Sequence, residues 1–187
     1  MTNITIHTQI TPNPNAWKFL VSQDVIAAGK ASFDSAADAE EVPLAAALFT
    51  IPNVSQILFF ENVITVTQDG DGSWRELEDN VRACIMDHIA DHDTNITTAD
   101  EAAKPDRSEL SADLQKIEEI LDRTIRPALQ GDGGDLDIVR YEDDKKLLLV
   151  QYQGACGSCP SATMGTLMAI KGILEDEFDP DIEVIPV

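Results

Sequence analysis

The chain has 187 residues, of which 43% are hydrophobic, so it is long enough for two small domains with buried cores. Its formal net charge is −21, because 34 acidic side chains face 13 basic ones. Such a field repels phosphate backbones and anionic lipid head groups, so we expect neither nucleic acid nor a membrane as a partner. There is no apolar run of about 20 residues, and the opening segment resembles neither a signal peptide nor a transit peptide, so we expect a cytoplasmic protein.

Residues 1–93 predict a mixed α+β domain. A helix is expected after Ser73, with Glu76 as its capping-box partner, because Leu77, Val81 and Ile85 recur at helical spacing. The other expected elements are strands over residues 4–10, 17–21, 56–60 and 63–67 and a short helix over residues 43–49. Residues 94–107 are polar, small and Pro-containing, as is typical of a linker.

Residues 108–187 predict a second domain with the order α-β-β-α-β, which gives an α+β protein of two small domains. Ser108 is expected to cap a helix with an apolar stripe that ends or kinks at Pro127. The expected elements after it are a hairpin of residues 136–141 and 146–152, a helix over about 161–178 and a strand over 182–187.

Two of the three cysteines form the motif Cys156-Gly-Ser-Cys159, between the predicted hairpin and the helix that follows it. Pro160 suits the first position of that helix, which makes Cys159 its N-cap. Unpaired backbone N–H groups and the positive end of the helix dipole favour a thiolate there. Because Gly154 and Gly157 permit a tight turn, we expect both sulfurs to be exposed at this strand–helix junction.

A lone C-x-x-C motif is compatible with four kinds of site. The two thiols can be structural, or they can be half of a zinc site, although no second pair or histidine lies nearby. They can also form a redox pair, with Cys156 as the nucleophile and Cys159 as the resolving thiol of a thiol–disulfide oxidoreductase. Finally, two chains of a symmetric dimer together offer the four thiolates that a [4Fe–4S] cluster requires.

Longer motifs surround these cysteines. The stretches Ile125-Arg-Pro-Ala-Leu-Gln-Gly-Asp-Gly-Gly-Asp135 and Gly154-Ala-Cys-Gly-Ser-Cys-Pro-Ser-Ala-Thr-Met-Gly-Thr-Leu167 resemble the NifU C-terminal domain, the cluster-binding module of Nfu-type proteins. The stretches Thr11-Pro-Asn-Pro-Asn-Ala-Trp-Lys-Phe-Leu20 and Ile85-Met-Asp-His-Ile89 are similar to the domain that precedes this module in Nfu-type scaffolds. The sequence departs from that pattern at Glu61-Asn62, where the family usually has a glycine and an acidic residue.

The resemblance implies an iron–sulfur cluster scaffold or carrier and no enzymatic activity. Its cofactor-binding and metal-ligating residues would be Cys156 and Cys159, which would hold a cluster, expected to be [4Fe–4S], between two subunits. The partners implied are a second copy of the chain when the cluster is loaded and apo iron–sulfur proteins as clients.

Two further motifs have ordinary interpretations that we prefer. Cys84, His88 and His92 share one face of a predicted helix and could form a metal site, but we expect a core thiol and two helix-end histidines. The loop from Gly131 to Asp135 lacks the Lys-Ser/Thr pair of a phosphate-binding loop. We expect it to end a helix and to lead into a strand, and as a secondary role it could support the cysteine loop through backbone hydrogen bonds.

Overall fold

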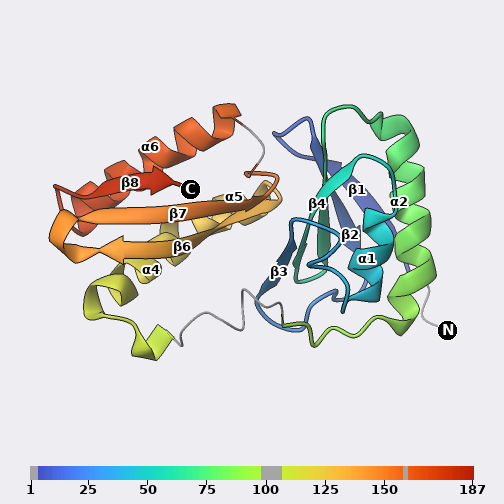
Figure 1. Ribbon diagram of the computed structural model, residues 1–187, viewed down its shortest axis with the longest axis horizontal. Helices are drawn as coiled ribbons and strands as arrows, with labels where there is room; N and C mark the ends of the chain where they lie inside the picture. The colour runs from blue at the N-terminus through green and yellow to red at the C-terminus, as the bar shows by residue number, and fades with distance from the viewer. Residues whose placement is uncertain (1–3, 98–106, 158–159) are drawn as a thin grey trace.

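The computed structural model describes residues 4–97, 107–157 and 160–187, which form two β-sheets with separate hydrophobic cores (Figure 1). Helices and strands are combined in each half, so the expected α+β class is confirmed. Most of the predicted linker, residues 98–106, lies outside the described residues. The domain boundaries 1–93, 94–107 and 108–187 therefore stay a prediction.

The N-terminal half is a five-stranded antiparallel sheet with the order β1-β2-β5-β4-β3. Its strands are β1 (Ile6–Ile10), β2 (Ala16–Val21), β3 (Lys30–Phe33), β4 (Val54–Phe60) and β5 (Val63–Gln68). The helices α1 (Pro43–Phe49) and α2 (Trp74–His88), which a short 3-10 turn (Ile89–Asp91) extends, cover one face of this sheet (Figure 1). All of these elements except β3 and the 3-10 turn match predicted segments.

The core of this half lies between the sheet and the two helices. Phe19, Phe59 and Ile64 point from three adjacent strands toward the helices, and Ile85 of α2 is fully buried with them. The helix α2 begins after Ser73 as predicted, but the Ser73 side chain makes no cap hydrogen bond. The predicted capping box is therefore wrong, and the burial of one apolar face stabilises this helix instead.

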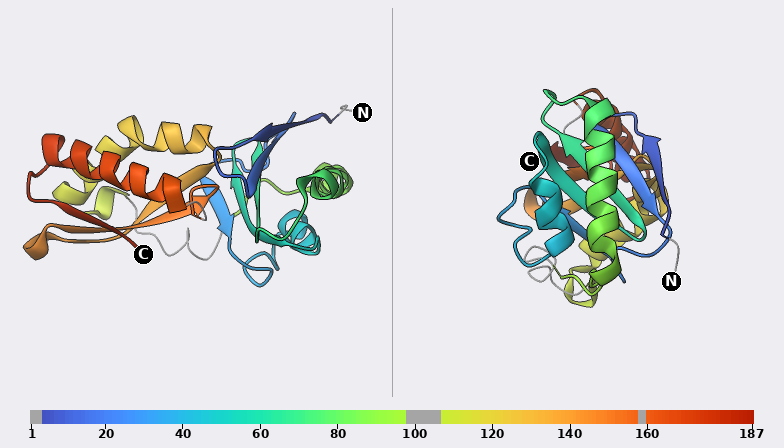
Figure 2. Two further views of the ribbon diagram at one scale, coloured as in Figure 1. Left: turned by 90° about the horizontal axis from the view of Figure 1, so that it is seen from above. Right: turned by 90° about the vertical axis from the view of Figure 1, so that its right-hand side faces the viewer.

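The C-terminal half has the predicted order apart from one additional short helix, α5, and its three-stranded sheet is β6-β7-β8, in which β6 and β7 are antiparallel and β8 runs parallel to β7. The helices α4 and α6 cover one face of this sheet (Figure 2), and the core of this half includes their buried side chains Ile117, Leu121, Ile170 and Leu174. The elements are α4 (Ala112–Thr124), α5 (Arg126–Gly131), β6 (Gly134–Glu142), β7 (Leu147–Gly154), α6 (Pro160–Glu177) and β8 (Glu183–Pro186), with 3-10 turns at Arg107–Glu109 and Asp143–Lys145.

The N-cap of the first helix of this half differs from the prediction, whereas the break near Pro127 agrees with it. Its N-cap is Ser111, whose hydroxyl accepts a hydrogen bond from the Leu114 amide at 3.3 Å, whereas Ser108 lies in the preceding 3-10 turn. The helix stops at Thr124, and α5 begins at Arg126 with Pro127 in its first turn. Proline is accommodated there because the first turn leaves its backbone nitrogen without an intrahelical acceptor.

The two halves touch through the face of the five-stranded sheet that the helices leave open (Figure 2). The end of the β6–β7 hairpin that carries Gly133, Gly134 and Gly154 lies against β2, β4 and β5 of this face. Among the described residues, no helix is both long enough and apolar enough to cross a membrane.

Candidate functional site

Cys156 lies in a tight loop that directly follows β7. The Ala155 amide donates to the Gly133 carbonyl at 3.0 Å, and the Gly157 amide donates to the Gly154 carbonyl at 3.1 Å. Gly133 and Gly154 have φ angles of +83° and +60°, which glycine adopts at little cost. The loop between α5 and β6 thus supports the cysteine loop through a backbone hydrogen bond, as predicted.

The Cys156 side chain packs inward against β6. A Cβ atom on Gly134 would lie 2.4 Å from the Cys156 sulfur, so the thiol occupies the space that a side chain at Gly134 would fill. The residue is only 7% exposed and belongs to the C-terminal core. The expectation that the Cys156 sulfur is exposed is therefore wrong. Gly134 has no side chain, which leaves space for the sulfur, and the sequence does not show that these two residues are neighbours.

The second cysteine of the motif, Cys159, lies outside the described residues, as does Ser158. The helix α6 begins at Pro160, as expected for a proline in the first helical position. The proposed N-cap role of Cys159 and the exposure of its sulfur stay predictions.

Tyr152, two residues before the end of β7, is close to Cys156. Burial raises the pKa of Tyr152 to about 12, and the neighbouring Cys156 adds to this rise. The tyrosine is 8% exposed, and its hydroxyl has no hydrogen-bond partner among the described residues. The inward-facing thiol therefore lies in poorly hydrated surroundings.

Residues of the N-terminal half reach the cysteine loop, which sequence reasoning did not predict. The Asn13 side-chain amide donates to the Ala155 carbonyl at 2.8 Å, in a buried contact. The Lys30 ammonium forms ion pairs with Asp135 at 3.0 Å and with Asp137 at 2.9 Å. These partners are more than 100 residues apart in the chain, and no local pattern in the sequence marks either contact.

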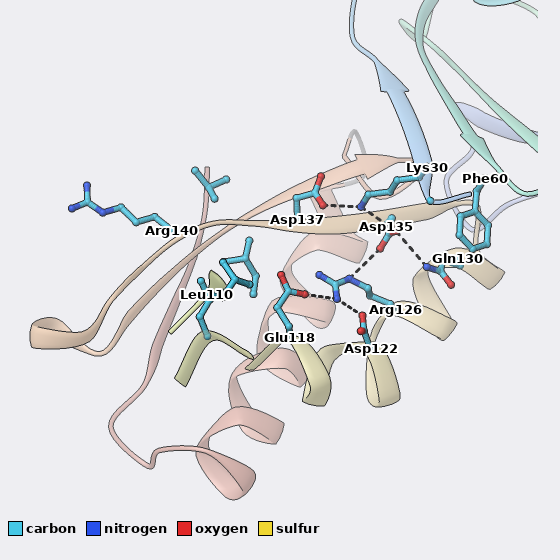
Figure 3. Close-up of a pocket in the computed structure, with 14 residues that line it drawn as sticks. Lys30, Phe60, Leu110, Glu118, Asp122, Arg126, Gln130, Asp135, Asp137 and Arg140 are labelled. Carbon is cyan, nitrogen blue, oxygen red and sulfur yellow. Dashed lines mark hydrogen bonds and ion pairs between the residues drawn. The ribbon is translucent and has the colours of Figure 1, made fainter. Parts of the chain in front are cut away.

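A buried charge network extends from Lys30 to α4 and α5 (Figure 3). The Arg126 guanidinium contacts Glu118 at 2.7 Å, Asp122, and Asp135 at 3.8 Å. Burial disfavours the charge of Arg126, but the carboxylates of Glu118 and Asp122 outweigh burial and raise its pKa. Asp135 thus faces cations from both halves of the chain.

A cavity of about 490 Å³ lies beside this network, between the two halves. Lys30 and Phe60 line it from the N-terminal side, and Leu114 and Ile138 are among the apolar residues opposite. Its charged groups are largely paired with one another, as the dashed contacts in Figure 3 show, and neither Cys84 nor Cys156, the cysteines that the structure describes, lines it. The cavity is therefore a feature of the contact between the halves, separate from the cysteine loop.

The Cys84, His88 and His92 side chains do not form a metal site. The His88 ring donates to the Cys84 carbonyl at 2.9 Å, and the His92 ring donates to the Val25 carbonyl at 2.7 Å. Burial, followed by the charge of Asp87, raises the pKa of Cys84, which disfavours the thiolate that binds metals. Within the part of the chain that the structure describes, no group of three or more His, Cys, Asp or Glu residues is arranged to hold a metal ion.

Comparison with protein-family models gives two matches. Residues 6–92 match the model described as scaffold protein Nfu/NifU N terminal, and residues 117–185 match the NifU-like domain. The second match includes both cysteines of the motif.

Curated relatives match nearly the whole chain. NifU-like protein 4, mitochondrial, of Arabidopsis thaliana is 31% identical over 95% of this chain and 68% of its own length. The NFU1 iron-sulfur cluster scaffold homolog, mitochondrial, of Homo sapiens is 34% identical over 95% of this chain and 69% of its own. Both relatives are named as mitochondrial proteins, which contradicts the expectation of a cytoplasmic protein.

Solved structures resemble part of the chain. A solution structure of a NifU-like protein from Saccharomyces cerevisiae is 21% identical, with a TM-score of 0.44, over 46% of this chain and 79% of its own.

Gly134→Ala tests the inward packing of Cys156. The added Cβ would also lie 2.8 Å from the Gln153 carbonyl. We therefore expect the state in which Cys156 packs inward to be destabilised by about 1–3 kcal/mol. That corresponds to a roughly five- to hundredfold faster reaction of Cys156 with a disulfide reagent, since each 1.4 kcal/mol is about tenfold. The rate is measured in a Cys84→Ser, Cys159→Ser background, where Cys156 is the remaining thiol. Gly131→Ala, where a Cβ meets nothing within 4 Å, is the control, and equal rates in the two variants would contradict the inward packing.

Proposed function

The chain belongs to the Nfu/NifU family of iron–sulfur cluster scaffold proteins, and on that premise we propose that it binds an iron–sulfur cluster between two subunits and transfers it to apo-proteins. Cys156 and Cys159 of each subunit would supply the ligands. The observation that carries this proposal is the position of this cysteine pair within the NifU-like match, in the part of the sequence between the end of β7 and the start of α6.

Ligand number supports sharing between subunits. A [4Fe–4S] cluster takes four thiolates, and the motif offers two per chain, so two chains related by a twofold axis complete the set. Cys84 is not available as a third ligand, because it lies on α2 in the other half of the chain and contacts the N-terminal core. We therefore propose a homodimer with a [4Fe–4S] cluster at its interface.

The cluster is the cargo of this protein, and the proposed roles of the residues follow from that. Cys156 would turn away from Gly134 to present its sulfur, while the glycines of the loop would keep side chains clear of the cluster. The N-terminal half, which does not carry the motif, would contribute to the choice of client. The chain would act as a carrier, with no enzymatic activity of its own.

The acidic surface supports release of the cargo. Each chain carries a formal charge of −21, and four thiolates around a 2+ core leave a further net negative charge, so two loaded subunits repel each other. This repulsion weakens the dimer and favours transfer to apo iron–sulfur proteins whose own cysteines are already positioned.

Cluster reconstitution with serine variants tests the ligand assignment. After anaerobic incubation with iron and sulfide, the full chain should turn brown and hold about two irons per chain. Cys156→Ser and Cys159→Ser should each lose this iron and the broad visible absorption, whereas Cys84→Ser, the matched control, should keep both. Retention of the cluster in Cys156→Ser, or reduction of a disulfide substrate by metal-free protein, would contradict the proposal; the latter would favour a thiol–disulfide oxidoreductase.

Transfer kinetics test the carrier role. The loaded protein should activate an apo-enzyme faster than it loses its cluster to a chelator at matched concentration, because transfer can proceed by direct exchange of thiolate ligands. The measurement follows the recovered enzyme activity beside the loss of visible absorption. Equal rates would indicate simple release and would favour a storage role.

A further inference from the structure

One face of the N-terminal sheet carries no helix and is nevertheless buried. Side chains alternate along strands, so Phe59 and Ile64 face the helices while their neighbours Leu58 and Thr65 face the opposite way. Leu58 is 2% exposed and Thr65 is 2% exposed, yet neither belongs to the core between the sheet and its helices. What covers this open face is the C-terminal half.

The covering segment is the glycine-rich end of the hairpin, which adjoins Cys156. A Cβ on Gly154 would lie 2.7 Å from a methyl carbon of Leu58, and a Cβ on Gly133 would lie 2.8 Å from the Lys18 side chain. The Lys18 ammonium also donates to the Gly131 carbonyl. The glycines therefore permit a close approach between the open face and the backbone that supports the cysteine loop.

Asn13 extends this contact to the residue before the cysteine. Asn13 is 4% exposed, and its side chain donates to the Ala155 carbonyl while its Oδ1 accepts the Asn15 amide at 2.9 Å. Its own turn is held by the Thr11 hydroxyl, which donates to the Asn13 carbonyl at 2.9 Å. An organised turn of the N-terminal half thus lies directly on the cysteine loop.

Lys30 supplies the charge that holds the two halves together. Its side chain is 11% exposed and reaches from β3 across to β6, where it contacts Asp135, Asp137 and the Leu136 carbonyl at 3.2 Å (Figure 3). Without Lys30, Arg126 alone among the cations of the described residues would face Asp135, at 3.8 Å, and its guanidinium is already paired with Glu118 and Asp122. When one partner of a buried ion pair is removed, the state in which the remaining charge stays buried becomes strongly unfavourable.

The contact is also incomplete, which permits it to open. The hydroxyls of Ser32 and Thr67 belong to the open face, since Ser32 pairs in register with Leu58, and Thr67 lies two residues beyond Thr65. Both hydroxyls are buried without a hydrogen-bond partner among the described residues. Hydroxyls buried in this way on the open face lower the stability of the closed state.

We propose that the open face of the N-terminal sheet closes over the cysteine loop in the cluster-free chain, and that Lys30 sets how readily it opens to admit a cluster and a second subunit. This inference concerns regulation of the site and rests on the proposed function. In the closed state, Ala155 is hydrogen-bonded to Asn13 and Cys156 points inward, so two such loops cannot face each other across a shared cluster. Opening is then a step that precedes loading and that follows transfer.

The test compares Lys30→Gln with Lys145→Gln in the full chain. Both changes remove one positive charge, but Lys145 is exposed and pairs with Glu142 within its own half. In the cluster-free Cys84→Ser, Cys159→Ser background, Lys30→Gln should raise the rate at which Cys156 reacts with a disulfide reagent by at least about tenfold. Lys145→Gln should leave the rate unchanged, and equal rates in the two variants would overturn the inference.

A charge exchange separates opening from loss of folding. Lys30→Glu combined with Asp137→Lys restores an attractive pair between the halves, so it should recover protection of Cys156, while Lys30→Glu alone should not. A combined variant as reactive as Lys30→Glu would overturn the inference, even if Lys30→Gln proves unstable.

Cluster uptake by chains with all cysteines intact should follow the same order, with Lys30→Gln loading faster than Lys145→Gln and the parental chain. If the thiol rates follow this order but no variant takes up iron, the closure stands and the proposed function fails. If every variant takes up iron at the parental rate, the proposed function stands and the regulatory role of Lys30 fails.

Discussion

The ion pairs that Lys30 makes with Asp135 and Asp137 hold the N-terminal half against β6, the strand that lies beside the cysteine loop. They connect β3 to the start of β6, next to Gly134, on which the Cys156 sulfur packs. Asp135 also faces Arg126, so one carboxylate is shared between a cation of each half. These groups are largely removed from water. Loss of Lys30 or of Arg126 would therefore leave buried carboxylates without enough positive charge beside them, so the arrangement depends on both cations.

Core packing and cluster binding require opposite orientations of the Cys156 side chain. Packing places its sulfur in the C-terminal core beside Tyr152, at a position that only a glycine at residue 134 leaves free. Cluster binding requires the same sulfur to be presented to a second subunit. The proposed carrier would reconcile these demands through two states of one loop, and the family to which the chain belongs is one of cluster scaffolds. In that proposal, the formal charge of −21 on each chain would limit the stability of the loaded dimer.

Periodic patterns predicted most of the fold, whereas contacts between distant residues could not be predicted. The apolar stripes of α2 and α4 and the strands of the β6–β7 hairpin were readable because local spacing produces them. The strand β3 was missed because four residues, Lys30–Phe33, are too few to establish an alternation. For the site, the motif located Cys156, but its inward packing depends on Gly134, more than 20 residues away, and Lys30 carries no local signal at all.

The central claim, that one cluster is held between two chains, is tested most directly by native mass spectrometry of the full chain after anaerobic loading with iron and sulfide. We expect a species of two chains with four irons and four sulfides, and a return to single chains when the cluster is removed. A single chain that retains all four irons in the absence of an external thiol would contradict it.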